Sequence, residues 1–211
     1  STPSVIANNV QYLLDDKGKL EYLYFPNTGN DTISFNDGQF SGPSLWLNGE
    51  NLLLSKTDRT NEFSGTNKGL NYSIKYVVKN NTMCLIVSCK NITEKMMNDI
   101  NLSVRLGIDH AMKTYPQWRK IYFPTLLKCE KTHFWGYYMN PNGSILGVAS
   151  PDPIASYHLQ YNNSSENFFS GHLIYTSTLD LLHPGNLPEE NPENCSSLRS
   201  GETRTWNIYL L

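Results

Sequence analysis

The 211-residue chain lacks the features that mark several large classes of protein. It has no excess of basic residues, since its formal net charge is −2 at pH 7, and therefore offers no positive field for the phosphates of nucleic acid. A run of about 18 apolar residues, which a membrane-spanning helix requires, is missing. The first residues do not have the pattern of a secretory signal peptide. A mature chain from which such a peptide had been removed would begin in the same way. We expect neither a nucleic-acid partner nor a membrane span.

Motifs of common cofactor and metal sites are also missing. The sequence has no G-x-G-x-x-G after a predicted strand, no P-loop, no H-E-x-x-H, no G-x-S-x-G and no EF-hand loop. A C-x-x-C pair is typical of zinc and redox sites, and the four cysteines of this chain form no such pair. We therefore expect no cofactor and no metal. Cys84 and Cys89 lie five positions apart in one predicted strand, on opposite faces, and we interpret them as buried free thiols.

No long stretch has the periodicity of a helix, and only residues 110–120, HAMKTYPQWRK, could form a short one, broken at Pro116. Strand patterns dominate instead. In GLNYSIKYVV, residues 69–78, apolar and polar side chains alternate, and Asn80 and Asn81 then supply a turn into a second strand. Residues 100–108 keep the same period. The sequence predicts three consecutive antiparallel strands here.

The same pattern recurs along the chain. Residues 10–26 and 134–150 each indicate two strands joined by a glycine-containing turn, and residues 170–182 and 203–211 indicate single strands on either side of a polar loop. No internal repeat or shift in composition divides the chain. We predict an all-β protein with few or no helices, forming a single domain over residues 1–211.

The order of these segments resembles the galactose-mutarotase-like supersandwich, a large antiparallel two-sheet β-sandwich. One anchor is LNYSIKYVVKNNTMCLIVSCKNITEKMMNDINLSVRLGIDH, with a polar step at Asn91-Ile92-Thr93 and His110 at its end. The other is SLRSGETRTWNIYLL, which is similar to the turn and closing strand of such domains. Mutarotases usually carry His-x-Tyr-Phe where this chain has Asp109-His110-Ala111-Met112. This departure speaks against mutarotase activity. The chain more closely resembles the N-terminal domain of bacterial polysaccharide-degrading enzymes with a helical, six-hairpin catalytic barrel.

The resemblance implies a non-catalytic N-terminal domain of a secreted or periplasmic carbohydrate-active enzyme, of glycoside hydrolase or polysaccharide lyase type. Such a domain packs against a downstream catalytic domain of the same polypeptide and contributes to a carbohydrate-binding cleft, so the chain would be the front part of a longer protein. Two alternatives stay open. The chain could be a mutarotase-like sugar epimerase that uses His110, or an independent carbohydrate-binding module.

Two aromatic segments are candidates for binding sugar. In THFWGYYM, residues 132–139, His133, Trp135 and Tyr137 would share one face of a strand, which suits either a sugar platform or, by preference, a core strand. The second segment, residues 115–120, is aromatic and basic. It could hold an acidic sugar or a partner domain, or pack over a sheet edge. The predicted binding residues are Tyr115, Trp118, Arg119, His133, Trp135 and His158.

Candidates for catalysis are few, and the catalytic residues of a parent enzyme stay unassigned. His110 beside Asp109 could act as a base, with His133 or His158 as the acid, although adjacent residues of a strand face opposite ways. Asp152 lies between two prolines in a loop that could present its carboxylate or simply connect strands. No pair of carboxylates can be assigned to glycoside hydrolysis.

Overall fold

The computed structural model describes residues 4–25, 31–34, 42–106, 123–129, 134–139, 145–162, 174–184 and 196–210. These residues form strands and their connections and contain no helix, which confirms the predicted all-β class. Accordingly, within these ranges no helix has the length and apolar character needed to cross a membrane. The expected short helix at residues 110–120 lies outside the described residues.

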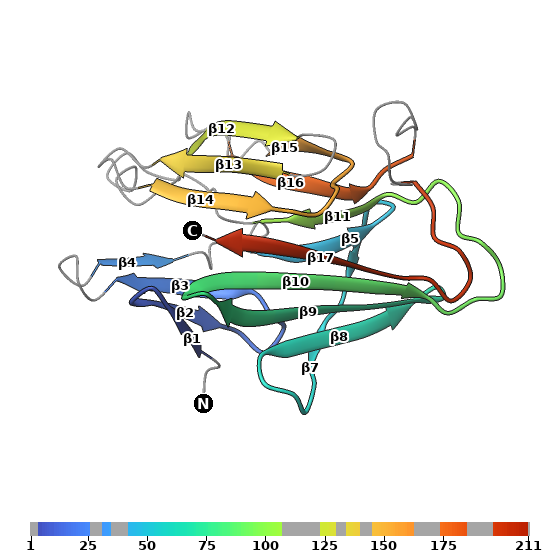
Figure 1. The fold of residues 1–211 in the computed structure, drawn as a ribbon, viewed down its shortest axis with the longest axis horizontal. Helices are drawn as coiled ribbons and strands as arrows, with labels where there is room; N and C mark the ends of the chain where they lie inside the picture. Colours follow the sequence, from blue (N-terminus) through green and yellow to red (C-terminus); the bar gives the residue numbers. More distant parts are fainter. Residues whose placement is uncertain are drawn as a thin grey trace.

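The strands form three antiparallel sheets (Figure 1). A four-stranded sheet has the order β1 (Ser4–Ala7), β2 (Val10–Leu14), β3 (Leu20–Phe25) and β4 (Asp31–Ser34). An eight-stranded sheet has the order β12 (Phe123–Cys129), β13 (Phe134–Met139), β14 (Ile145–Ser150), β17 (Thr203–Leu210), β10 (Thr82–Asn91), β9 (Leu70–Lys79), β8 (Glu62–Asn67) and β7 (Ser55–Lys56). A five-stranded sheet has the order β15 (Ser156–Asn162), β16 (Ile174–Leu182), β11 (Leu102–Arg105), β5 (Ser44–Leu47) and β6 (Glu50–Leu52).

The hairpin β9–β10 forms as the alternation predicts. Its strands pair from Lys79 with Thr82 to Leu70 with Asn91. The turn residues Asn80 and Asn81 have φ angles of 51° and 59°, and asparagine tolerates this left-handed region better than most residues. The predicted pairs β2–β3 and β13–β14 also form.

The prediction of three consecutive antiparallel strands is wrong for the third strand. β11 does not extend the sheet next to β10 but pairs with β5 and β16 in the five-stranded sheet. Residues 92–101 lead from one sheet to the other and pair with the closing segment through a bridge between Met97 and Leu198. Period-two alternation places Leu102 and Val104 in the core but does not specify which sheet the strand joins.

One hydrophobic core contains residues of all three sheets. The eight-stranded sheet contributes alternate residues such as Ile74, Leu85 and Ile208, and the five-stranded sheet contributes Leu45 and Val104, all of them at most 1% exposed. Since successive strand residues point to opposite faces, the side chains between these positions lie on the outer faces of the two sheets. These outer faces are where a binding site can form.

Candidate functional site

The structure places few of the predicted site residues. Tyr115, Trp118, Arg119, His110 and His133 lie outside the described residues, so their roles stay predictions. The backbone of Trp135 lies in β13, paired with Lys128 and Ala149, and that of His158 lies in β15, paired with Thr178. These two strands belong to different sheets. The fold therefore does not bring Trp135 and His158 to one row of a common sheet.

The outer face of the five-stranded sheet carries polar and charged side chains that the sequence analysis did not select. Its cross-strand rows follow from the register. One row contains Ser44, Arg105, Thr178 and the backbone position of His158; the next contains Trp46, Ser103, Asp180 and Ser156. Ser103, Thr178 and Asp180 are buried, whereas Trp46 and Arg105 are partly exposed.

Trp46 and Arg105 form the most closely defined pair on this face. The guanidinium carbon of Arg105 lies 3.5 Å from the centroid of the Trp46 ring. The indole Nε1 of Trp46 donates a hydrogen bond of 2.9 Å to Ser44 Oγ, which fixes the orientation of the ring. A guanidinium over an indole gains about 0.5–1 kcal/mol when exposed and about 2 kcal/mol when desolvated. Burial lowers the pKa of Arg105.

Asp180 supplies a carboxylate to the same face but is held by its neighbours. It is 2% exposed, and its Oδ2 accepts a hydrogen bond of 2.8 Å from Ser156 Oγ on the adjacent strand. Among the side chains that the structure describes on this face, Asp180 is the only carboxylate. This set can bind a ligand, but its described side chains do not supply an acid–base pair of the kind that sugar ring opening needs.

A shallow groove of 320 Å³ lies on the outer face of the eight-stranded sheet. Ser64, Ser73 and Ser88 line it in a row across three strands, and Thr205 continues the row on β17. Ser88 Oγ and Thr205 Oγ1 are 3.0 Å apart and hydrogen-bonded to each other. Because these hydroxyls can satisfy one another, the groove is explained as a solvated face of the sheet.

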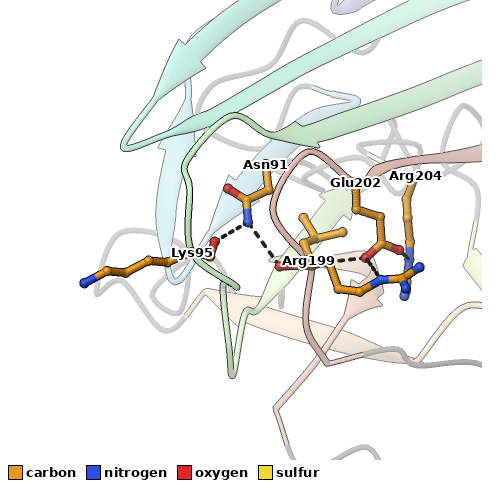
Figure 2. A network of polar contacts seen from close by, with 6 residues as sticks. Asn91, Lys95, Arg199, Glu202 and Arg204 are labelled. Carbon is orange, nitrogen blue, oxygen red and sulfur yellow. Dashed lines mark hydrogen bonds and ion pairs between the residues drawn. The ribbon is translucent and has the colours of Figure 1, made fainter.

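The two segments that carry the sequence resemblance meet at Asn91 (Figure 2). This residue is fully buried. Its Nδ2 donates hydrogen bonds of 2.8 Å to the Lys95 carbonyl and 3.1 Å to the Leu198 carbonyl. Its Oδ1 accepts from the backbone N–H of Thr93 at 2.9 Å and from the Thr93 hydroxyl at 2.6 Å. Asn91 therefore joins the end of β10 to the turn before β17. Its burial also excludes its N-x-T triplet from glycosylation in the folded chain.

Glu202 stabilises the turn that Asn91 contacts. Its carboxylate accepts hydrogen bonds of 2.8 Å from the Arg199 backbone N–H and 2.9 Å from Arg204 Nε (Figure 2). Partial burial raises the pKa of Glu202, but the hydrogen bonds from Arg199 and Arg204 and their charges outweigh it, and the net shift is downward. The turn is thus held by an ionised carboxylate. Its groups are used in structural contacts rather than offered to a ligand.

The carboxylate of Asp152 is also structural. Its Oδ2 accepts hydrogen bonds from the Asn207 backbone N–H at 2.6 Å and from Asn207 Nδ2 at 3.1 Å. β14 pairs with β17 only at Val148 and Ala149, so Asp152 takes the place of a further strand partner along β17. This geometry confirms the interpretation of the loop as a connection between strands.

Cys84 and Cys89 are buried free thiols, as predicted. Cys89 lies in the hydrophobic core, where burial raises its pKa to about 12. Cys84 lies on the other face of β10, with its Sγ 3.8 Å from Asn207 Oδ1, and burial raises its pKa as well. In the described part of the chain, no group of three His, Cys, Asp or Glu side chains is placed to hold a metal ion.

Comparisons with known proteins find structural but not sequence relatives. No family model matches the chain, and no curated protein matches its sequence. A solved chain named Polysaccharide Lyase BACCELL_00875 is similar over 98% of this chain and 33% of its own length, with 12% identity and a TM-score of 0.70. A proposed aldose 1-epimerase from Escherichia coli K12 is similar over 100% of this chain and 98% of its own, with 10% identity and a TM-score of 0.52. At these identities the likeness shows the fold.

Proposed function

We propose, from the premise that this chain has the galactose-mutarotase-like supersandwich fold, that it is a non-catalytic domain of a carbohydrate-active enzyme. One observation carries the proposal: the chain matches a polysaccharide lyase over 98% of its own length but spans about a third, 33%, of that enzyme. The parent protein would be a glycoside hydrolase or polysaccharide lyase, secreted or periplasmic. This chain would pack against its catalytic domain and form part of the wall of a glycan cleft.

The chemistry of the described side chains supports a binding role. The outer face of the five-stranded sheet offers a partly exposed indole and a partly exposed guanidinium, which suit contacts to a sugar. Its one described carboxylate, that of Asp180, is 2% exposed and hydrogen-bonded to Ser156. A buried carboxylate held in this way is poorly placed to act alone on a glycosidic bond, which normally requires two carboxylates.

The test begins with the natural gene product. Intact mass spectrometry of the protein from its source should give a product several hundred residues longer than this chain. Polysaccharide cleavage should then require the added residues, and the 211-residue chain alone should release no product from a panel of polysaccharides. A natural product that ends near Leu211, or cleavage by the chain alone, would refute the proposal.

An independent sugar epimerase is the second candidate. The near-complete mutual coverage with the proposed aldose 1-epimerase, at 100% and 98%, favours it. His110 would then act as the catalytic base. Polarimetry on freshly dissolved glucose and galactose should show faster interconversion of anomers with the chain and loss of that increase in His110→Ala. Rates at the uncatalysed background would eliminate this candidate.

A carbohydrate-binding module is the third candidate, and the predicted aromatic residues favour it. It requires saturable binding of a glycan by the isolated chain, weakened in Trp118→Ala or Trp135→Ala. Unchanged affinity in both variants would rule out these two residues as the platform.

A further inference from the structure

Arg105 differs from the other described arginines in its electrostatic partners. Of the four arginines that the structure describes, three have a carboxylate within ion-pair distance: Arg59 with Glu62 at 3.8 Å, and Arg199 and Arg204 with Glu202 at 3.6 and 2.9 Å. In contrast, the neighbours of Arg105 in its cross-strand row, Ser44 and Thr178, are neutral. Among the described side chains, none forms an ion pair with Arg105.

The position of Arg105 makes this lack of a carboxylate costly. Its side chain is partly buried over Trp46, and desolvation, the cause of its lowered pKa, penalises the charged guanidinium. The indole face compensates for part of this penalty. A guanidinium stacked on an indole still has N–H donors that point outward in the guanidinium plane. Two of these donors can bind the two oxygens of one carboxylate.

A second unsatisfied group lies next to Arg105 in the sheet. Thr178 is paired with Arg105 across β16 and β11 and is 2% exposed. Within the part of the chain that the structure describes, its Oγ1 has no hydrogen-bond partner. A buried hydroxyl without a partner costs about 1–3 kcal/mol. Because this oxygen is covered in the folded chain, a carboxylate can reach it only by displacing the atoms above it; it would then accept hydrogen bonds from both side chains and remove both penalties.

We propose that Trp46, Arg105 and Thr178 form a carboxylate-binding site on the outer face of the five-stranded sheet, and that its ligand is an acidic sugar residue of a polysaccharide. The sugar part of this inference rests on the proposed function, whereas the carboxylate part does not. Arg105 binds the carboxylate through two N–H donors, Thr178 donates a hydrogen bond, and Trp46 holds the guanidinium in place. The site selects uronic-acid chains over neutral ones.

The experiment measures binding of three probes to the 211-residue chain by isothermal titration calorimetry. The probes are tetragalacturonate, its carboxyl-reduced neutral counterpart, and sodium acetate as a carboxylate without a sugar. The variants are Arg105→Gln, which removes the charge, and Arg105→Lys, which keeps the charge but not the planar fork. Arg59→Gln is the matched control, because Arg59 is exposed and paired with Glu62 outside this face.

Tetragalacturonate should bind at least about 10-fold more tightly than its neutral counterpart, since hydrogen bonds between charged groups contribute about 1.5–3 kcal/mol. Arg105→Gln should remove this preference, Arg105→Lys should retain a fraction of it, and Arg59→Gln should leave it unchanged. If Arg105→Gln does not fold, Thr178→Val provides the second test. This variant keeps the shape of the side chain and should weaken tetragalacturonate binding severalfold.

The remaining outcomes separate the inference from the proposed function. Equal binding of the acidic and neutral oligosaccharides would overturn the carboxylate site and leave the proposed function intact. Binding of acetate that depends on Arg105, without binding of either oligosaccharide, would support the carboxylate site and count against a carbohydrate role. Binding that Arg105→Gln leaves unchanged, or no binding of any probe, would overturn the inference.

Discussion

Replacing Asn91 with alanine should destabilise the domain by about 3 kcal/mol. The substitution removes four hydrogen bonds, two donated to the Lys95 and Leu198 carbonyls and two accepted from Thr93. Each neutral hydrogen bond contributes about 0.5–1.5 kcal/mol net, which gives a range of about 2–6 kcal/mol for the four bonds. The lower half of this range is expected because Leu198 O still accepts from the Met97 N–H, and because the single proton of the Thr93 hydroxyl can then be donated to Lys95 O.

Urea unfolding followed by tryptophan fluorescence measures this loss. The total stability of a domain is about 5–15 kcal/mol, so a loss of about 3 kcal/mol shifts the midpoint clearly. The matched control is Asn71→Ala, since Asn71 lies opposite Lys90 on the same hairpin but is exposed. It should cost at most about 0.5 kcal/mol, as a surface substitution does. If Asn91→Ala were no more destabilising than the control, Asn91 would not be the connection inferred here.

Three further predictions concern the two cysteines of β10, Gly65 in β8, and Glu202 in the turn before β17. With the other two cysteines replaced by serine, Cys84 and Cys89 should not react with Ellman's reagent at pH 8 until urea unfolds the chain, because burial raises both pKa values; rapid reaction in the folded state would contradict this. Gly65→Ala should cost about 1–3 kcal/mol in urea unfolding, because an added Cβ would clash with the Leu53 carbonyl oxygen; unchanged stability would show that the connection between β6 and β7, which carries Leu53, can move aside. The pKa of Glu202 is lower in the folded state, so its stabilising contribution is present above the unfolded pKa of about 4.3 and is lost as the pH falls through the folded value. Glu202→Gln should therefore lose less stability than the wild type between pH 6 and pH 3 in the same assay, and an identical loss would refute the assignment.

The sequence predicted strands well because one face of each sheet is buried. In β9, the buried positions Leu70, Tyr72, Ile74 and Tyr76 alternate with more exposed ones, and this is the pattern that the sequence displays. The sheet to which β11 belongs could not be predicted in the same way. Alternation predicts that Leu102 and Val104 point into the core, but the eight-stranded and the five-stranded sheet both face that core. The choice between them depends on pairing with β5 and β16, whose residues are far away in the sequence.

The candidate site was harder to predict than the fold. Aromatic residues and histidines that cluster along the chain are visible in the sequence, whereas Trp46 and Arg105 are separated by more than 50 positions and become neighbours only when β5 pairs with β11. A local signal did exist at Arg105. In the alternating segment LSVR, Arg105 is at a position that points away from the core. A side chain must lie on that face to contact a ligand.

The place of β17 in the eight-stranded sheet affects how the chain can assemble. This strand lies between β14 and β10, with Leu210 opposite both Met83 and Val148 (Figure 1). Until its residues have left the ribosome, the partner edges of β10 and β14 stay open, and an open sheet edge can pair with another chain. We infer that this sheet closes only once β17 is available, through contacts that are distant in sequence and therefore slow to form. Asn91 and the turn at Leu198–Glu202 would then guide the closing strand to its register as it arrives.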